Sequence, residues 1–141
     1  MIIKNGIIFI PFFNFMNMKL QHIGLTIPEN SEVKNFYQDL LGMIEVKNFV
    51  LNKELSYKIF NIPEDTPAFF MQKNDLFIEL FISHEKLTSG FNHNCISVND
   101  RKTLVGKAKA RNYECIIIER EFSDLIFIKD KSGNIFEIKE K

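Results

Sequence analysis

The stretch Leu20-Gln21-His22-Ile23-Gly24-Leu25-Thr26-Ile27 recurs in altered form as Phe91-Asn92-His93-Asn94-Cys95-Ile96-Ser97-Val98. His22 and His93 are separated by 71 residues, and other positions pair at the same offset, including Thr26 with Ser97. Alternate residues of the first stretch are apolar, which is the period of a β-strand with one buried face. The sequence therefore predicts an internal duplication in which each copy begins with a strand that carries a histidine.

The residues that follow predict one order of elements in both copies: strand, helix and three strands, in an α+β fold. The first helix has a candidate N-cap at Ser31 and ends at Gly42. Its inward-facing residues recur at helical spacing: Val33, Phe36, Tyr37, Leu40 and Leu41. The expected strands are 20–27, 43–51, 68–73 and 75–83, then 91–98, 114–120, 124–129 and 134–140. The second helix spans 100–111, with Leu104, Val105 and Ala108 inward, and 84–90 is a connector.

Each copy also ends with a strand that carries a glutamate, Glu79 in the first and Glu137 in the second. Both glutamates and both histidines are expected on the sheet face opposite the apolar stripe that packs on the helices. A carboxylate on an otherwise apolar face is unfavourable unless a cation or hydrogen-bond donors meet it. Taken singly, such a histidine is more often a satisfied core residue, and such a glutamate a partly exposed one. Two imidazoles and two carboxylates in matching places instead favour a divalent-metal site.

The other residues that carry chemistry have simpler interpretations. His84 begins the charged connector and is expected in solvent. Asp124 and Asp130 lie at a strand end and a turn, where short carboxylates stabilise loops. Cys95 and Cys115 are expected as buried free thiols in a reducing cytoplasm, since two cysteines make no disulfide framework.

Length and charge limit the class of protein. Lys plus Arg and Asp plus Glu are both 18, and the 15 phenylalanines lie in apolar runs. A neutral chain of this kind is not expected to bind nucleic acid. The length suffices for one domain, which we place at residues 18–141, with modules over 18–83 and 91–141.

Residues 1–17 precede this domain and have an unusual composition. The apolar run 7–13 is too short to span a bilayer and contains Pro11. Because Met18 already precedes the first predicted strand, we interpret residues 1–17 as a misassigned start or an apolar arm. A membrane anchor is the weakest alternative.

The first copy is longer than the second between its histidine and its glutamate, 57 residues against 44. We place the extra residues at 53–66, as a short helix followed by a turn. Leu55, Ile59 and Phe60 are expected to pack this helix onto the sheet. Tyr57 is then expected to face the cleft of the predicted metal site. The alternative is a surface helix that covers exposed core.

Several motifs together resemble the vicinal oxygen chelate superfamily, which includes glyoxalase I, methylmalonyl-CoA epimerase, the bleomycin and fosfomycin resistance proteins and the extradiol dioxygenases. The matching segments are 22–25 (His-Ile-Gly-Leu), 36–42 (Phe-Tyr-Gln-Asp-Leu-Leu-Gly), 78–80 (Ile-Glu-Leu), 92–93, 98–100 and 130–137 (Asp-Lys-Ser-Gly-Asn-Ile-Phe-Glu). The resemblance covers residues 20–141. It implies two βαβββ modules that form a curved mixed sheet with a metal-binding cleft, often closed by dimerisation.

The resemblance also implies a ligand set of His22, Glu79, His93 and Glu137. This set is most similar to that of glyoxalase I, since the epimerase usually has glutamine at the position of Glu79. The dioxygenases and the fosfomycin resistance enzymes use two histidines and one glutamate, and the bleomycin-binding proteins generally lack the set.

The activity implied is that of a divalent-metal-dependent lyase or isomerase of the glyoxalase I type. Such an enzyme stabilises an enediolate during proton transfer on a small α-oxygenated substrate, with Glu137 or Glu79 moving the proton. Nickel, cobalt, zinc or manganese fits these ligands. We expect a cytoplasmic homodimer that binds a small-molecule substrate and does not bind a membrane.

Two positions depart from bacterial glyoxalase I. Thr26 and Ser83 stand where those enzymes carry an arginine and an asparagine that serve glutathione, so the cationic clamp for a carboxylate is missing. Together with Tyr57, these residues are the candidate substrate pocket. The alternatives are an acyl-CoA epimerase, an antibiotic-resistance protein and a non-catalytic small-molecule binder.

Overall fold

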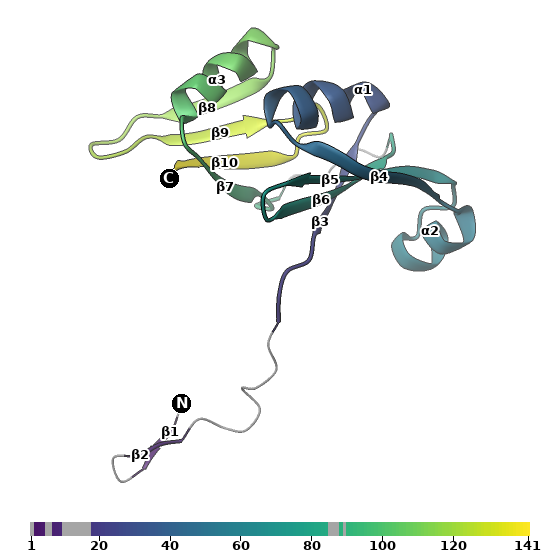
Figure 1. Ribbon diagram of the computed structural model, residues 1–141, viewed down its shortest axis with the longest axis horizontal. Coiled ribbons are helices and arrows are strands. Elements are labelled where there is room, and N and C mark those ends of the chain that lie inside the picture. Colours follow the sequence, from purple (N-terminus) through teal and green to yellow (C-terminus); the bar gives the residue numbers. More distant parts are fainter. Residues whose placement is uncertain (1, 5–6, 10–17, 85–87, 89) are drawn as a thin grey trace.

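Two four-stranded mixed sheets, one from each half of the chain, form the body of the structure (Figure 1). It is a computed structural model that describes residues 2–4, 7–9, 18–84, 88 and 90–141. The strands are β3 (Ile23–Ile27), β4 (Ile44–Leu51), β5 (Thr66–Lys73), β6 (Leu76–Ile82), β7 (Asn94–Val98), β8 (Glu114–Ile118), β9 (Leu125–Lys129) and β10 (Ile135–Glu140). The strand orders are β3-β6-β5-β4 and β7-β10-β9-β8. The predicted α+β fold of two similar modules is confirmed.

The two modules share one strand register. In each, the first strand runs parallel to the last, and the remaining neighbours are antiparallel. Gly24 lies opposite Glu79 on β3–β6, and Cys95 lies opposite Glu137 on β7–β10. The duplication predicted from the constant offset is therefore present in the backbone pairing.

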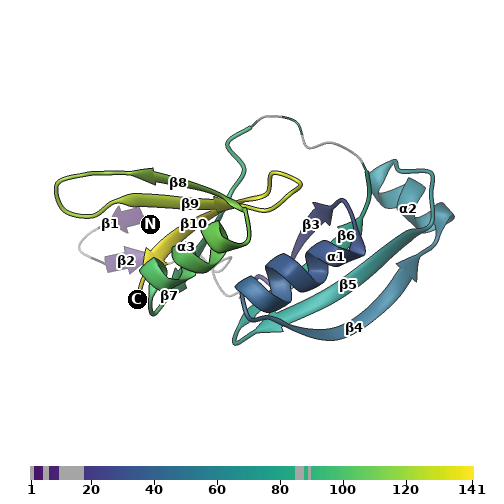
Figure 2. The same ribbon diagram turned by 90° about the horizontal axis from the view of Figure 1, so that it is seen from above.

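Helices from both modules lie over the same side of the two sheets (Figure 2). The first begins as α1 (Asn30–Glu32) and continues in wider π-type turns as η2 (Val33–Leu40), and the second module contributes α3 (Arg101–Ala110). The predicted inward-facing residues are all buried: Val33, Phe36, Tyr37, Leu40, Leu41, Leu104, Val105 and Ala108. Gly42 follows the first helix with a φ of 69°, a conformation that a residue without Cβ adopts easily.

The first helix starts earlier than predicted. Glu29 occupies the N-cap position without a side-chain cap, so the predicted cap at Ser31 is wrong. Glu32, in the first turn, is buried and accepts hydrogen bonds from the Tyr113 hydroxyl and the Lys131 N–H, both at 3.2 Å. These contacts with the second module hold the turn, and nothing in the local sequence reveals them.

The first strand of each module is shorter than predicted. β3 begins at Ile23 and β7 at Asn94, so each histidine lies just before its strand. Cys95 is exposed, contrary to the prediction, because its side of β7 faces away from the helices. Cys115 is partly buried, and burial raises the pKa of its thiol.

A buried carboxylate, Asp130, joins the two modules from the turn between β9 and β10. Its oxygens accept hydrogen bonds from the Tyr37 hydroxyl (2.7 Å), the Asn134 side-chain amide (2.7 Å) and the N–H groups of Ser132 (3.0 Å) and Asn134 (2.8 Å). Asn134 also donates to the Thr26 carbonyl at 2.8 Å. Burial raises the pKa of the Asp130 carboxyl, and these donors oppose that rise. The predicted loop-stabilising role of Asp130 is confirmed and extends to the other module.

The segment without a repeat contains a helix, α2 (Lys53–Phe60), as predicted. Residues 119–124, which connect β8 and β9, contain no corresponding helix. α2 lies on the side of the first sheet opposite α1 (Figure 1).

The N-terminal residues that the structure describes form a short hairpin. β1 (Ile2–Lys4) pairs antiparallel with β2 (Ile7–Phe9). Residues 10–17 of the predicted leader, and residues 85–87 and 89 of the predicted connector, lie outside the described residues. Among the helices described, none is long and apolar enough to cross a bilayer.

Replacing Tyr37 with phenylalanine keeps the buried ring and removes its hydrogen bond to Asp130. We expect the free energy of unfolding to fall by about 1–3 kcal/mol at neutral pH, because a buried acceptor loses its partner. Urea denaturation followed by circular dichroism measures this change. Tyr57→Phe, on the exposed face of α2, is the matched control and should leave stability unchanged.

The same variant should change the alkaline pH dependence of stability. Burial and the nearby Asp130 raise the pKa of Tyr37 well above its usual value of 10.0. Because the folded pKa lies above the unfolded one, stability is fully present below pH 10 and is lost as the pH rises toward the folded pKa. The loss should be less steep in Tyr37→Phe. Identical pH profiles would contradict this assignment.

Candidate metal centre

The first histidine–glutamate pair lies on the face of the first sheet that α1 and η2 leave uncovered. His22 precedes β3, Glu79 lies in β6, and His22 Nε2 is 3.2 Å from Glu79 Oε2. The imidazole edge packs on the ring of Phe70, with centroids 5.6 Å apart. The His22 side chain is 43% exposed and that of Glu79 is 19% exposed, so ligand atoms can reach both.

The second pair repeats this arrangement on the second sheet. His93 Nε2 is 3.5 Å from Glu137 Oε2. His93 Nδ1 lies 2.8 Å from the Phe91 carbonyl oxygen, so the N–H of this ring nitrogen donates to that carbonyl. In the neutral imidazole, Nε2 then presents a lone pair to the carboxylate. Two lone-pair atoms this close attract each other only through a cation, either a proton or a metal ion, and metal-binding histidines characteristically use their second nitrogen in this way.

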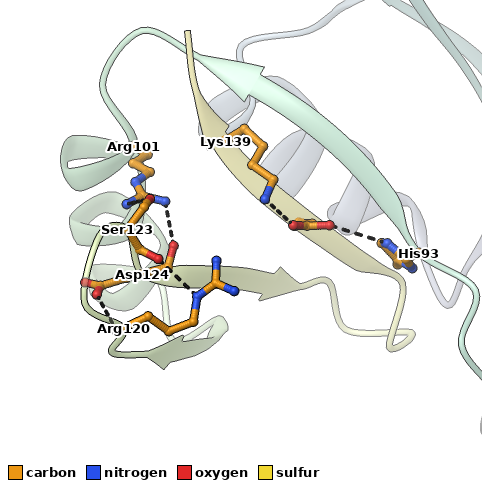
Figure 3. A network of polar contacts seen from close by, with 7 residues as sticks. His93, Arg101, Arg120, Ser123, Asp124 and Lys139 are labelled. Carbon is orange, nitrogen blue, oxygen red and sulfur yellow. Dashed lines mark hydrogen bonds and ion pairs between the residues drawn. The ribbon is translucent and has the colours of Figure 1, made fainter.

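A lysine holds the other oxygen of the second carboxylate (Figure 3). Lys139 Nζ is 2.7 Å from Glu137 Oε1. The hydrogen bond from Lys139 lowers the pKa of the Glu137 carboxyl, helped by the charges of Lys139 and His93. Glu137 is therefore a carboxylate at neutral pH, which is the form that binds metal. Lys139 is not among the predicted site residues, although its position two residues after Glu137 on the same strand puts both on one face.

Two arginines in the same view serve a different purpose. Arg101 donates to the Asp124 carbonyl at 2.9 Å, and Arg120 Nε donates to the Ser123 carbonyl at 3.1 Å (Figure 3). The Asp124 carboxylate accepts from the Arg120 N–H at 3.3 Å, which confirms its predicted role in the turn. These contacts stabilise the β8–β9 connection.

The donor atoms fit a divalent cation in type and spacing. Two donors that bind one ion at about 2.1 Å, with angles of about 90–110°, are separated by about 3.0–3.4 Å. The observed separations of 3.2 and 3.5 Å are close to this range. Each pair is therefore suited to supply one imidazole and one carboxylate to an ion.

The two pairs do not meet within one chain. The described residues contain no cluster of three or more His, Cys, Asp and Glu side chains that could hold a metal ion. The four predicted ligands thus form two matching half-sites, and their convergence on a single ion stays a prediction. His84, the third histidine, is exposed at the end of β6, as expected.

The first half-site is surrounded by aromatic rings. Phe77 and Phe81 flank Glu79 on β6, and Phe70 lies beside it on β5. The Phe70 and Phe77 centroids are 5.9 Å apart, and Lys47 Nζ lies 5.4 Å from the Phe70 centroid. This side of the first sheet is a half-buried, mainly apolar surface.

α2 reaches this aromatic surface through Phe60, one of the three residues predicted to pack it onto the sheet. The helix rests on the sheet through buried Ser56 and through Phe60, whose ring centroid is 5.4 Å from that of Phe81. The predicted packing of Phe60 is therefore confirmed, whereas Leu55, Ile59 and Tyr57 stay 45%, 60% and 57% exposed.

A cavity of about 210 Å³ lies between α2 and the first sheet. Its lining includes Thr26, Ser83, Phe60 and Phe81, whereas Tyr57 is not part of it. A larger cavity of about 840 Å³ lies between the modules, with Thr26 and His93 on its walls. Two of the three predicted pocket residues therefore line a cavity close to a half-site.

Comparison with known families identifies the class of protein. Residues 19–138 match the model of the Glyoxalase/Bleomycin resistance protein/Dioxygenase superfamily. The chain belongs to this superfamily, as its motifs predicted. No match was found among curated protein sequences.

Several solved structures have the same fold. A glyoxalase family protein from Bacillus cereus is 13% identical with a TM-score of 0.71, over 89% of this chain and 95% of that one. The fosfomycin resistance protein FosX from Listeria monocytogenes, complexed with Mn(II) and sulfate, is 16% identical with a TM-score of 0.67, over 89% and 91%. FosX from Mesorhizobium loti is 14% identical with a TM-score of 0.66, over 88% and 92%. At these identities the likeness establishes the fold alone.

Removing one imidazole should strongly reduce metal binding. We expect His93→Ala to weaken Ni(II) and Mn(II) affinity by at least about 100-fold. Replacing a residue that only hydrogen-bonds to a metal ligand already lowers metal affinity about 10- to 100-fold, and the loss of a ligand itself should cost at least as much. Calorimetric titration of tag-free protein measures this, with circular dichroism as the test of folding. His84→Ala removes the same side chain away from both half-sites and should bind like the parent. Equal affinities in all three proteins would contradict the assignment of His93.

Proposed function

We propose that this protein is a divalent-metal-dependent lyase or isomerase of the glyoxalase I type, acting on a small substrate with oxygens on adjacent carbons. The observation that carries the proposal is the presence of two histidine–glutamate pairs at one register of a duplicated module. Membership of a superfamily whose name includes glyoxalases and dioxygenases is consistent with such chemistry.

We infer that the full ligand set forms across a homodimer. One chain would provide His22 and Glu79, and its partner copy would provide residues equivalent to His93 and Glu137. Exposed aromatic side chains support a second copy, since Phe91 and Phe122 are 99% and 94% exposed in the single chain. A two-fold dimer would then contain two equivalent sites.

The residues present suggest how the site works. A bound divalent cation would polarise the substrate carbonyl and stabilise the negative charge that develops on its oxygen. Glu79 or Glu137 would take the proton from the hydroxyl-bearing carbon and return it to the former carbonyl carbon. The hydroxyl proton passes to the former carbonyl oxygen, so the reaction neither gains nor loses protons overall. The Phe91 carbonyl keeps His93 Nε2 directed at the site. Nickel, cobalt, zinc and manganese all fit these ligands.

The surroundings favour a substrate other than a glutathione adduct. Thr26 and Ser83 carry no charge to hold the glutathione carboxylates, and the face around Glu79 is aromatic. On the Glu79 side, a substrate with an apolar group, such as an acyl-thioester, matches this aromatic surface better.

A fosfomycin-modifying activity is the second candidate. A FosX structure from Listeria monocytogenes with a TM-score of 0.68 holds Mn(II) and 1S,2S-dihydroxypropylphosphonic acid, which has oxygens on adjacent carbons. In this chain Glu79 adds a fourth candidate ligand to the three that the resemblance assigns to such enzymes.

Turnover by the metal-loaded protein tests the proposed reaction. The protein is loaded separately with nickel, cobalt, zinc and manganese and incubated with methylglyoxal plus glutathione, coenzyme A or cysteine, and separately with fosfomycin. We expect metal-dependent formation of a lactoyl thioester, seen by NMR, and a loss of at least about 100-fold in kcat in Glu79→Gln and Glu137→Gln. Glu54→Gln, on exposed α2, is the control. Consumption of fosfomycin alone would favour the second candidate, and no turnover of any substrate would contradict both.

Mixing two inactive variants tests the arrangement across the dimer. One protein carries His22→Ala with Glu79→Ala, and the other carries His93→Ala with Glu137→Ala. If the site spans two chains, a mixed dimer contains one intact site, so mixing after subunit exchange should restore tight metal binding. Each protein alone should bind no ion tightly. A mixture that stays unable to bind would indicate that all four ligands come from one chain or do not meet.

A further inference from the structure

The two modules differ at one position beside their matching glutamates. In the first, Thr26 lies opposite Phe81, two residues after Glu79. In the second, Ser97 lies opposite Lys139, two residues after Glu137. Alternate residues of a strand share a face, so each of these side chains borders its own half-site. The same place is thus occupied by an aromatic ring in one half-site and by an ammonium group in the other.

The first half-site offers a surface for an apolar group. The ring centroids of Phe81 and of Phe60 in α2 are 5.4 Å apart, and the ring of Phe70 packs against those of Phe77 and His22. All four phenylalanines keep part of their surface exposed. Covering such rings with an apolar group removes both from water, which is favourable.

The second half-site offers a cation with unused donors. Lys139 Nζ has three N–H groups, and Glu137 Oε1 is its only partner recorded among the described residues. Its side chain is 47% exposed. The exposed hydroxyl-bearing residue Ser97 lies next to it on the neighbouring strand. An ammonium with a hydroxyl beside it suits an anionic oxygen.

The first half-site also shows that a lysine is not needed to hold the glutamate. Glu79 occupies the same register as Glu137, faces its histidine at a similar distance and is about as well covered, 19% against 15% exposed. Phe81 stands where Lys139 stands in the other module, so an ammonium group is not required at that position to keep a glutamate facing its histidine.

We propose that the site is two-sided and takes a small organic anion with an apolar or aromatic substituent. Lys139, with Ser97, binds the anionic group, and the rings of Phe70, Phe77 and Phe81 bind the substituent. This inference rests on the proposed function, because a metal ion between the half-sites would hold the adjacent oxygens of the same molecule.

Three probes separate the two sides of the site. Mandelate has adjacent oxygens, a negative charge and a phenyl ring; glycolate lacks the ring, and 2-hydroxyacetophenone lacks the charge. Calorimetry with the Mn(II)-loaded protein compares their affinities, and the Mn(II) affinity itself is measured first. We expect the parent protein to bind mandelate about 10-fold or more tighter than either of the others.

Variants then assign each preference to its residues. Lys139→Gln should lower mandelate affinity by about 10-fold and leave 2-hydroxyacetophenone unchanged, while Lys139→Arg should keep the preference. Phe77→Leu should weaken mandelate but not glycolate. Lys109→Gln removes one positive charge from α3, on the opposite side of the sheet, and is the matched control.

The outcomes distinguish this inference from the function on which it rests. Failure of the parent protein to bind Mn(II) or another divalent ion would overturn both. Normal metal binding with the same mandelate preference in Lys139→Gln as in the parent would overturn the two-sided site and leave the metal centre standing. Loss of the preference in Lys139→Gln with unchanged metal affinity would support it.

Discussion

The buried carboxylate of Asp130 is the contact on which the arrangement of the two modules depends. A charge inside a protein persists only where donors replace its water, and the donors to Asp130 come from its own turn and from Tyr37 of the other module. Glu32 makes the reciprocal contact, since this residue of the first module accepts hydrogen bonds from Tyr113 and Lys131 of the second. The donors to Glu32 both come from the second module, and Asp130 gains Tyr37 as its fourth donor only when the modules dock. Docking and the formation of the turn after β9 are therefore coupled.

This docking determines where chemistry can take place. It gathers both helices and the aromatic core of Phe36, Tyr37 and Phe136 on one side of the sheets. The other side carries both histidine–glutamate pairs, and no helix of the second module covers it. A half-exposed imidazole facing a carboxylate is a stable arrangement in water, but it is only half of a metal site. The single chain thus presents two separate half-sites on an open surface, which is why we look to a second copy to complete them.

The repeated module gives the two half-sites matching donor residues, but the residues beside them differ. The donor residues and the strand register are the same in both modules. The neighbours are not: rings surround Glu79, whereas Lys139 and exposed Cys95 border Glu137. A substrate held between unlike walls can be oriented, because each end has a surface that suits it. The helix α2 adds to the apolar wall only, through Phe60.

The sequence by itself determined the duplication, the order of the strands and helices, the inward faces of the helices and the superfamily. It also determined which four residues form the two pairs. The elements and their inward faces follow from periods of two and of three to four residues, and the pairs follow from a repeated motif, whereas the superfamily follows from the resemblance of several motifs to its members. Tertiary structure decided the rest. The start of the first helix depends on Glu32 reaching the second module, and the contact of α2 depends on which of its sides meets Phe81. The exposure of Cys95 and the ion pair of Lys139 with Glu137 depend on which sheet face the helices leave open. These features result from contacts between residues distant in the chain, and local patterns of hydrophobicity carry no information about such distances.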